Sequence, residues 1–301
     1  MTAKQRAHIL FVIALLLLIL SIAEGEQISE AIRASLSLCA RSLIPALLPS
    51  LVVSGLLVSV AAEVRMPFDA FFSRIFRLPR IAATAFLLGA LCGFPIGAHT
   101  AAQLFERGAL SREEAERTAA LSANTGPTFC VLAVGVGFFE SVRVGWWIYA
   151  IQLSSAILLG IIDRRGKGSK STAAPALAAS SFSFSDGIYR AAITLLSVSA
   201  TVCFFSAVCA PLAHHLPPFP AALLSAILEV GGGCYAASRL TPPFGMLLAS
   251  FSVSLSGISV LLQSAAALTP SGIGIAPLVK RKLAQAALAL ILSLLTLPTV
   301  M

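Results

Sequence analysis

The sequence predicts an all-α polytopic membrane protein, built as an inverted repeat with two re-entrant helical hairpins and broken transmembrane helices. Three observations support this fold class. The 301 residues are 57% hydrophobic and only 11% charged, whereas a soluble domain carries about 25% charged residues. Several apolar stretches are interrupted near their middle by Gly, Pro or short polar residues. One interrupted stretch recurs in the second half of the chain, and the loop charges give the two copies opposite orientations.

The first interrupted stretch is 87–104, which reads LLGALCGFPIGAHTAAQL. Gly93, Phe94 and Pro95 break its helical pattern, and Gly97 loosens it further. Each half would be roughly 18 Å of helix, too short for a bilayer core of about 30 Å. Backbone groups freed by such a break need protein or a water-filled cavity around them. Broken half-helices of this kind form substrate sites in transporters.

The stretch 223–240, LLSAILEVGGGCYAASRL, repeats this pattern. The offset that aligns Leu87 with Leu223 also aligns Gly97 with Gly233, and the interruptions GFPIG and EVGGG coincide. Two further polar breaks, at 124–127 and 254–257, follow the two hairpins in the same order. We therefore expect each half to contain a span, a hairpin, a broken span and a final span.

We divide the chain into an N-terminal transmembrane helix (1–30), a first repeat (31–165), a cytoplasmic linker (166–186) and a second, inverted repeat (187–301). The first repeat would hold a span at 31–61 kinked by Pro45 and Pro49, an amphipathic surface helix within 63–80, a hairpin at 81–106, a broken span at 111–140 and a span at 144–162. The second would hold a span at 187–213, a hairpin at 221–240, a broken span at 244–268 and a last span at 283–298. A capping box is expected at Ser111 and Glu114.

Loop charges set the predicted topology. Lys4 and Arg6 precede the first apolar run and Glu24 and Glu26 follow it, which puts the N-terminus in the cytoplasm. The alternative is a cleaved signal peptide ending near Ala23, which leaves the later topology unchanged. The basic loop at 163–170 and the residues 280–282 are expected inside. If the two hairpins were instead full spans, residues 164–170 would fall outside, against the positive-inside rule.

Glu229 is the acidic residue that the pattern places inside the second hairpin. A carboxylate at that depth costs several kcal/mol unless it is paired or hydrated. It could couple transport to H⁺ or Na⁺ or orient a polar solute; alternatively, it only accepts hydrogen bonds from the amides of 231–233. Half-helix N-termini near the breaks attract anionic groups. The predicted substrate-binding residues are Gly93, Phe94, Pro95, Gly97, Asn124, Thr125, Glu229, Gly231, Gly232, Gly233, Ser254, Ser256, Gly257, Ser259 and Gln263.

Other classes of function find little support. The six Cys include no CxxC pair and the four His have no metal-ligand spacing, so we expect no metal and no resident cofactor. No P-loop, catalytic triad or nucleophile elbow occurs, and we do not expect an enzyme. The net charge of +8 sits in short loops that set topology, so it does not indicate nucleic acid. The expected partners are a small solute and the lipid bilayer, with a homo-oligomer left open.

Several motifs together resemble a known family. GALCGFPIGAHTAAQLFERGALSREEAERTAALSANTGP, then VGVGFF, and SLSGISVLLQ in the second half are similar to the YlbJ-type sporulation integral membrane proteins. These belong to the nucleoside-recognition, or Gate, domain membrane proteins, which are distantly similar to concentrative nucleoside transporters. The resemblance covers roughly residues 40–290 and implies that the two repeats are Gate-type. It also implies a bacterial cell membrane, in spore formers the one around the forespore, and passage of small solutes such as dipicolinic acid.

The leading hypothesis is a transporter or permease for a small polar, preferably anionic solute bound at mid-membrane between hairpin tips and broken helices. Two alternatives stay open: a non-transporting membrane component of sporulation, and a nucleoside or nucleobase transporter. We expect the hairpin tips and the breaks at 124–127 and 254–257 to share one cavity, because all four need polar surroundings in the membrane.

Overall fold

The computed structural model describes residues 3–61, 67–164 and 183–300, which form helices joined by short turns. The first half contains α1 (Ala3–Ala23), α2 (Gly25–Leu38), the π-helix η1 (Cys39–Leu43), α3 (Ile44–Ala61), α4 (Asp69–Phe76), α5 (Ala82–Cys92), α6 (Ile96–Glu106), α7 (Arg112–Ser122), the π-helix η2 (Thr128–Phe138) and α8 (Val142–Ile162). The second half contains α9 (Phe184–His214), α10 (Pro218–Leu228), α11 (Val230–Ser238), α12 (Pro242–Leu255), α13 (Gly257–Leu268), α14 (Ile275–Thr296) and the short 3₁₀-helix η3 (Leu297–Thr299).

Helical segments of the described chain are long and apolar enough to cross a bilayer. These candidate spans are Gly25–Val53, Val142–Ile162, Phe184–His214, Pro242–Leu268 and Ile275–Thr299. Many large apolar side chains on their outer faces are exposed, as on α9 and α14. An exposed apolar surface of this extent is stable in lipid rather than in water. The protein is therefore a multi-pass integral membrane protein, as the composition predicted.

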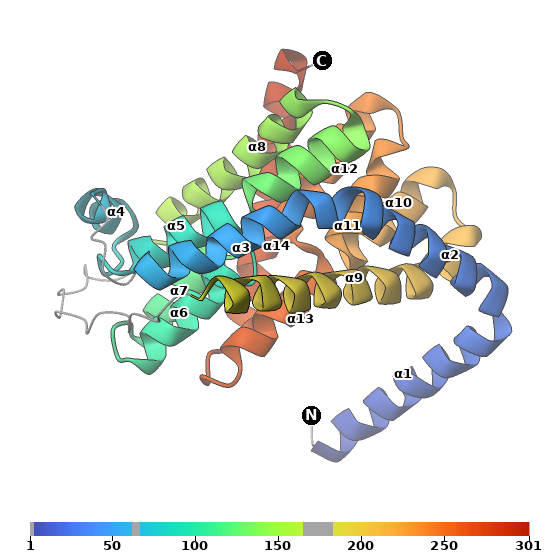
Figure 1. Ribbon diagram of the computed structural model, residues 1–301, viewed down its shortest axis with the longest axis horizontal. Helices are drawn as coiled ribbons and strands as arrows, with labels where there is room; N and C mark the ends of the chain where they lie inside the picture. Colours follow the sequence, from blue (N-terminus) through green and yellow to red (C-terminus); the bar gives the residue numbers. More distant parts are fainter. Residues whose placement is uncertain (1–2, 62–66, 165–182, 301) are drawn as a thin grey trace.

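Two long helical segments run side by side across the molecule (Figure 1). One is the continuous helix α2–η1–α3, and the other is α9, which packs along it. In the first segment, where Pro45 and Pro49 were predicted to cause a kink, the π-helical turn η1 lies just before Pro45. Proline has no backbone N–H, so it cannot donate the usual hydrogen bond to the carbonyl of the preceding turn. A π-helical turn is one way for a helix to accommodate that missing hydrogen bond.

The predicted breaks in the short apolar stretches are all present. α5 ends at Cys92 and α6 begins at Ile96, so the first break falls on Gly93, Phe94 and Pro95. α10 ends at Leu228 and α11 begins at Val230, so the second falls on Glu229 alone. It is shorter than the predicted interruption EVGGG, because the three glycines belong to α11. In each case the two short helices pack against each other. Each pair also packs against the helix that follows it, α7 in the first half and α12 in the second.

The two segments that were predicted as broken spans, α7–η2 and α12–α13, follow these pairs and keep that name below. α7 begins with the predicted capping box of Ser111 and Glu114 and ends before the break at 123–127. α12 and α13 are separated at Ser256, which has a φ of 71°, and Gly257, which has a φ of 65°. α8 packs on η2, and α14 packs on α12, α8 and α7. α14 thereby joins the second half to the broken span of the first.

The short helix α4 lies at the edge of the molecule opposite to α1 (Figure 1). The Phe72 and Phe76 side chains are buried and form an aromatic cluster with Phe86 of α5. This confirms a helix within the stretch 63–80, of which residues 63–66 lie outside the described part. The helical spacing of Phe72 and Phe76 thus places both side chains against α5.

Some predicted boundaries are wrong. The helix expected at 31–61 already begins at Gly25, and α14 begins at Ile275 instead of residue 283. Lys280, Arg281 and Lys282 therefore belong to a helix and not to a loop. The linker expected at 166–186 lies mostly outside the described residues, and its last three residues belong to α9.

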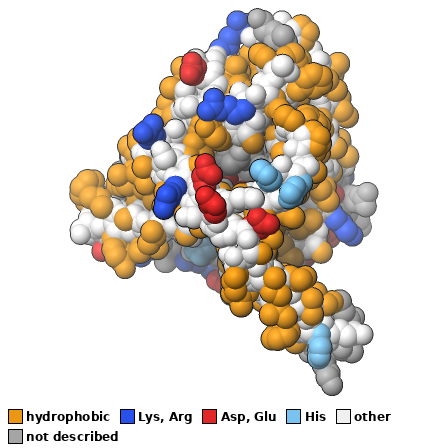
Figure 2. Space-filling model, turned by 90° about the vertical axis from the view of Figure 1, so that its right-hand side faces the viewer, with side chains coloured by type: hydrophobic (Ala, Val, Ile, Leu, Met, Phe, Trp, Pro, Cys, Tyr) orange, Lys and Arg blue, Asp and Glu red, His pale blue; other side chains and the backbone are white. Residues whose placement is uncertain are grey.

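Figure 2 shows the end of the molecule that lies at the right of Figure 1. Acidic, basic and His side chains gather there around a hollow in an otherwise largely apolar surface. The start of α2, with Glu26 and Glu30, and the end of α9, with His214 and His215, contribute exposed ionisable groups. Charged groups at a span's ends and apolar groups along its length are the distribution expected for a protein in a bilayer.

Candidate functional site

The main cavity lies where the broken segments of both halves meet the two long helices. It encloses about 660 Å³ of empty space, including its open mouth. Its walls come from η1 and α3, the α5–α6 break, the α7–η2 break, α9, the α10–α11 break and α13. The lining residues are Leu43, Leu47, Leu51, Cys92, Gly93, Phe94, Thr125, Gly126, Thr128, Phe129, Thr194, Val198, Thr201, Val202, Glu229, Val230, Gly231, Val260 and Gln263.

The tip of the first helix pair packs tightly on the first broken span. Gly93 has a φ of 80°, which favours glycine. A Cβ at this position would lie 2.7 Å from the backbone N of Gly126, closer than atoms can pack. Both glycines line the cavity, so at this point the cavity wall consists of backbone.

The tip of the second pair is built around Glu229. Its side chain caps α11, accepting a hydrogen bond from the Gly232 N–H at 2.5 Å. The side chain is buried and also lines the cavity. A Cβ added at Gly257 would lie 3.2 Å from the Glu229 Cα, so this tip rests on the second broken span. Gly93 and Glu229, which the sequence repeat aligns, thus contact the break of the following span in the same way.

The aligned glycines Gly97 and Gly233 also occupy similar places. A Cβ at Gly97 would lie 2.2 Å from the carbonyl O of Ser122 in α7 and 2.9 Å from the Cα of Gly89 in α5. A Cβ at Gly233 would lie 2.4 Å from the Cα of Ala226 in α10. In both pairs the glycine allows the two short helices to approach closely.

The structure brings together six of the predicted site residues around the cavity: Gly93, Phe94, Thr125, Glu229, Gly231 and Gln263. The remaining nine do not line it. Gly97 and Gly233 pack helices, Gly232 donates to Glu229, and Pro95 and Gly257 shape the turns. Ser254, Ser256 and Ser259 are buried beside the second break, and the Ser254 and Ser259 hydroxyls have no hydrogen-bond partner among the described residues. The cavity therefore includes the tips of both helix pairs and the break at 123–127. The break at Ser256 and Gly257 does not line it and packs against Glu229.

Sequence reasoning missed the contribution of the long helices. α9 supplies the hydroxyls of Thr194 and Thr201, which stand two turns apart with Val198 between them. Thr128, at the start of η2, adds another hydroxyl to the lining. Residues seven apart share a helix face, so this polar spacing in an apolar span is a signal that could have found the two α9 residues.

Asn124 belongs to a buried polar cluster instead of the cavity. Lys282 Nζ donates to Asn124 Oδ1 at 3.3 Å and to Gln285 Oε1 at 2.9 Å. Gln285 Nε2 donates to Asn124 Oδ1 and to the Gln152 carbonyl, both at 3.1 Å. Gln152 Nε2 reaches the Thr125 carbonyl at 3.5 Å. This cluster joins α14 and α8 to the break of the first broken span.

Lys282 was expected in a basic run on the cytoplasmic side before the last span, and its placement outside a helix is wrong. Its side chain is only 1% exposed. The buried face of α14 contains Leu278, Lys282, Gln285, Ala286, Ala289 and Ser293. This i, i+4, i+7 pattern continues without interruption through Lys282 and Gln285, a signal that the run of basic residues obscured.

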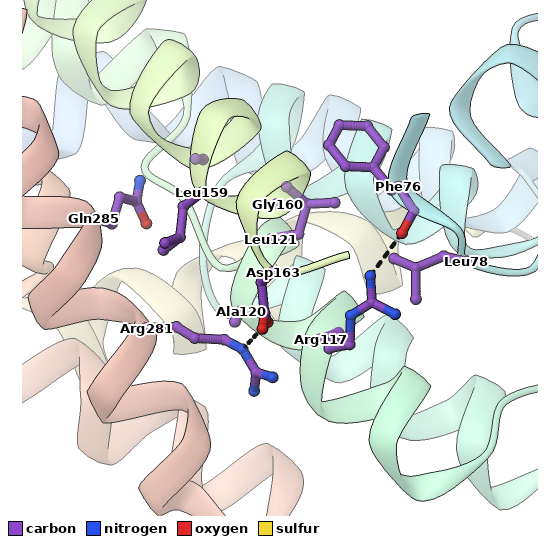
Figure 3. A pocket seen from close by; sticks show the side chains of 11 residues that line it. Phe76, Leu78, Arg117, Ala120, Leu121, Leu159, Gly160, Asp163, Arg281 and Gln285 are labelled. Carbon is purple, nitrogen blue, oxygen red and sulfur yellow. Dashed lines mark hydrogen bonds and ion pairs between the residues drawn. The ribbon is translucent and has the colours of Figure 1, made fainter. Parts of the chain in front are cut away.

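A second, smaller cavity lies near the end of α8, between α7 and α14 (Figure 3). It encloses about 350 Å³. Arg281 Nε and Asp163 Oδ2 form an ion pair at 2.6 Å, and the buried Arg117 donates to the Phe76 carbonyl at 2.6 Å. Gln285 belongs both to the wall of this cavity and to the buried cluster. The cluster thus lies between Thr125, on the main cavity, and the smaller cavity.

Comparison with known proteins supports the motif resemblance. Over 133 residues the chain is 35% identical to the sporulation integral membrane protein YlbJ of Bacillus subtilis (strain 168). The chain is homologous to that protein. The matched region covers 44% of this chain and 31% of YlbJ, so the chain matches about a third of its relative's length. No family model matches the chain, and no solved structure matches it. The predicted similarity to YlbJ is confirmed, while the Gate-type assignment stays a prediction.

Proposed function

We propose that the protein is a secondary transporter, or permease, for a small polar solute that binds in the main cavity. The observation that carries the proposal is the cavity itself, which is walled by both tips and by both long helices. Irregular backbone at membrane depth is tolerated where it lines a cavity. Transporters use such broken helices to build their binding sites near the bilayer midplane.

We further propose that the two halves form an inverted repeat and that the pairs α5–α6 and α10–α11 are re-entrant hairpins. The aligned positions Gly93 and Glu229 each contact the break of the following span, and the aligned Gly97 and Gly233 each let their helix pair close. Equivalent contacts at equivalent positions support common architecture. In such a repeat one half rocks against the other around a fixed site.

The chemistry of the cavity narrows the solute class. Among the described residues, its lining contains one carboxylate, that of Glu229, together with hydroxyls and the Gln263 amide, and no Lys, Arg or His. A bare anion would meet a like charge there, which disfavours binding. The lining favours a solute that is neutral or cationic, or an anion that binds together with H⁺ or Na⁺. Phe94 and Phe129 add aromatic surface, which favours a flat ring such as a nucleobase or a pyridine.

The homology suggests where such a transporter acts. YlbJ is a sporulation protein of the membrane, so in a spore former we propose the membrane around the forespore and dipicolinate, with a compensating cation, as the first solute to test. A nucleoside is the second candidate, because the cavity combines aromatic surface with neutral hydrogen-bonding groups. The N-terminus would lie in the cytoplasm.

The test is uptake into proteoliposomes, with dipicolinate, nucleosides and dicarboxylates as solutes and with or without H⁺ or Na⁺ gradients. Uptake of one of these that saturates with concentration and is lost in protein-free liposomes is expected. Absence of uptake for the whole panel, with folded protein in the bilayer, would favour a membrane component of sporulation that does not transport.

Glu229→Gln tests the coupling role within the same assay. The amide keeps the shape and can still accept the Gly232 hydrogen bond, but it cannot exchange a proton. We expect wild-type uptake to change with pH or with the ion gradient and uptake by the variant to lose that dependence. Glu113→Gln on the exposed start of α7 is the matched control. Equal rates and equal pH profiles for wild type and Glu229→Gln would reduce Glu229 to a helix cap.

A further inference from the structure

Lys282 is a fully buried amine in a helix long and apolar enough to cross the bilayer. It lies in α14, within the candidate span Ile275–Thr299, and is among the largest side chains that the structure buries completely. An ionisable side chain at such a position is costly and is a functional-site hypothesis by default. Neither the main cavity nor the smaller one includes Lys282 in its lining, so it is not a residue that a solute in either cavity touches.

The partners of Lys282 are oxygens of neutral groups. Asn124 Oδ1 and Gln285 Oε1 accept from Nζ, and within the described residues no carboxylate lies at ion-pair distance from it. The rest of the cluster fixes both oxygens in place. Asn124 donates its own amide hydrogen to the Leu121 carbonyl at 2.7 Å, and Gln285 donates to Asn124 and Gln152. The Gln285 oxygen therefore accepts from the amine, and the Asn124 oxygen accepts from both the amine and the Gln285 amide.

The position of the cluster favours a positive charge on Lys282, although no counter-ion lies beside it among the described residues. α7 ends at Ser122, and Asn124 lies two residues beyond that end, bonded to a carbonyl of its last turn. The C-terminal end of a helix carries a partial negative charge that favours cations. In broken transmembrane helices, such C-terminal ends and the unwound segment beside them commonly coordinate coupling cations.

We propose that Lys282 is a built-in cation of the first broken span. Its ammonium occupies the place at the end of α7 where a bound metal cation would otherwise sit, and it holds the break in the shape that presents Thr125 and Gly126 to the main cavity. The break then needs no ion from solution, and any coupling to H⁺ or Na⁺ is left to Glu229. Lys282 is thus a positioning residue, and its role does not depend on which solute is transported.

The experiment removes the amine and supplies it again from solution. In Lys282→Ala the missing atoms are those of propylammonium. We expect this variant, purified in detergent, to unfold at a clearly lower temperature than wild type and to regain much of that loss with propylammonium. Neither 1-propanol, which lacks the charge, nor tetramethylammonium, which lacks N–H donors, should restore it. Lys280→Ala, on the exposed face of the same helix, is the control and should behave like wild type.

Lys282→Met separates charge from volume. Methionine fills nearly the same space without a charge, so it should remain destabilised and should not respond to propylammonium. A methionine variant as stable as wild type would overturn the proposal, as would a Lys282→Ala protein that folds but gains no more from propylammonium than from 1-propanol. Because the readout is thermal stability, these results stand whether or not any solute is transported.

A second comparison applies if the Lys282 variants do not fold. Asn124→Asp places a carboxylate beside the ammonium, whereas Gln152→Glu makes the same chemical change at a side chain that does not touch Lys282. If Lys282 is charged, the first variant should accumulate folded in the membrane, although it gives up the bond to Leu121, and the second should not. Equal loss of folded protein in both variants would refute a charged Lys282.

Discussion

At the scale of single residues, the side chains of two buried ionisable residues, Glu229 and Lys282, reach opposite kinds of helix end. Glu229 caps the N-terminus of α11 through Gly232, and Lys282 is bonded to Asn124 just past the C-terminus of α7. A helix dipole favours an anion at the first position and a cation at the second. Each half of the molecule thus contributes one helix end that would stabilise one charge, and the two ends favour charges of opposite sign.

The aligned glycines give a direct prediction about packing. Gly97→Ala would bring a methyl group within 2.2 Å of the Ser122 carbonyl, and Gly233→Ala would bring one within 2.4 Å of the Ala226 Cα. Backbone cannot move aside easily, so we expect each substitution to destabilise the protein by about 1–3 kcal/mol. Thermal unfolding in detergent measures this loss. Gly25→Ala, where nothing lies within 4 Å of the new methyl, is the control; equal behaviour of all three variants would contradict the packing.

Sequence reasoning at this scale succeeded where a residue has one local consequence. Gly93 readily adopts the positive φ that ends α5, Pro95 lacks the N–H of a helix interior, and Ser111 with Glu114 forms a cap, so these positions were predictable. Lys282 was misread because its environment comes from residues far away in the chain, Asn124 and Gln152. From sequence alone, a run of basic residues such as 280–282 is interpreted as a surface loop, because the residues that bury it lie elsewhere in the chain.

At the scale of helices, side-chain contacts tie the ends of α8 and α14 together. At one end of α14, Arg281 pairs with Asp163; at the other, the Trp147 indole donates to Thr296 Oγ1 at 2.9 Å, and Arg143 donates to the Thr299 carbonyl. α14 is thus fixed along its length against a helix of the first half. This arrangement favours α8 and α14 moving as one unit, so α14 would move with the first half if the halves rock.

The ion pair can be tested by a double-mutant cycle with Arg281→Ala and Asp163→Ala. Both side chains are partly exposed, 22% and 25%, so we expect a coupling of only about 0.2–1 kcal/mol. Midpoints of thermal unfolding in detergent give this value. Arg281→Ala combined with Asp186→Ala on α9 should be additive; a coupling as large in that pair would show that the effect is not specific to the contact.

The positions of the helix breaks could be predicted from the sequence, whereas the π-helical form of one element could not. Breaks at Gly, Pro, Asn and Ser were found because those residues disfavour helix interiors. The π-helical form of η2 was not predicted, because its sequence TFCVLAVGVGF is almost entirely apolar and carries no periodic signal. The conformation of η2 is associated with its close contact with α8: a Cβ on Gly135 would lie 2.6 Å from the Gly145 Cα of α8. Such a close approach depends on tertiary packing.

At the scale of the whole molecule, the proposed topology predicts opposite sides for the two ends of the spans. Arg164 follows α8 and His215 follows α9, and we expect the first in the cytoplasm and the second outside. Single cysteines at these positions, in a protein whose six native cysteines have been replaced, would be labelled with a membrane-impermeant maleimide in intact cells. Labelling of position 215 alone is expected, and position 164 should label only after lysis. Labelling of both from the same side would contradict the inverted repeat.

The two buried charges have an electrical consequence for the whole molecule. With Glu229 ionised and Lys282 protonated, these two groups sum to zero, and a proton on Glu229 leaves them with one positive charge. Moving one elementary charge through the membrane field is worth about 2.3 kcal/mol per 100 mV. If both groups cross the field together as the cavity changes sides, the empty carrier would reorient without sensing voltage, while the proton-loaded carrier would be drawn toward the negative side. A membrane potential that is negative in the cytoplasm would then drive net transport toward the cytoplasm, even for a solute that carries no charge.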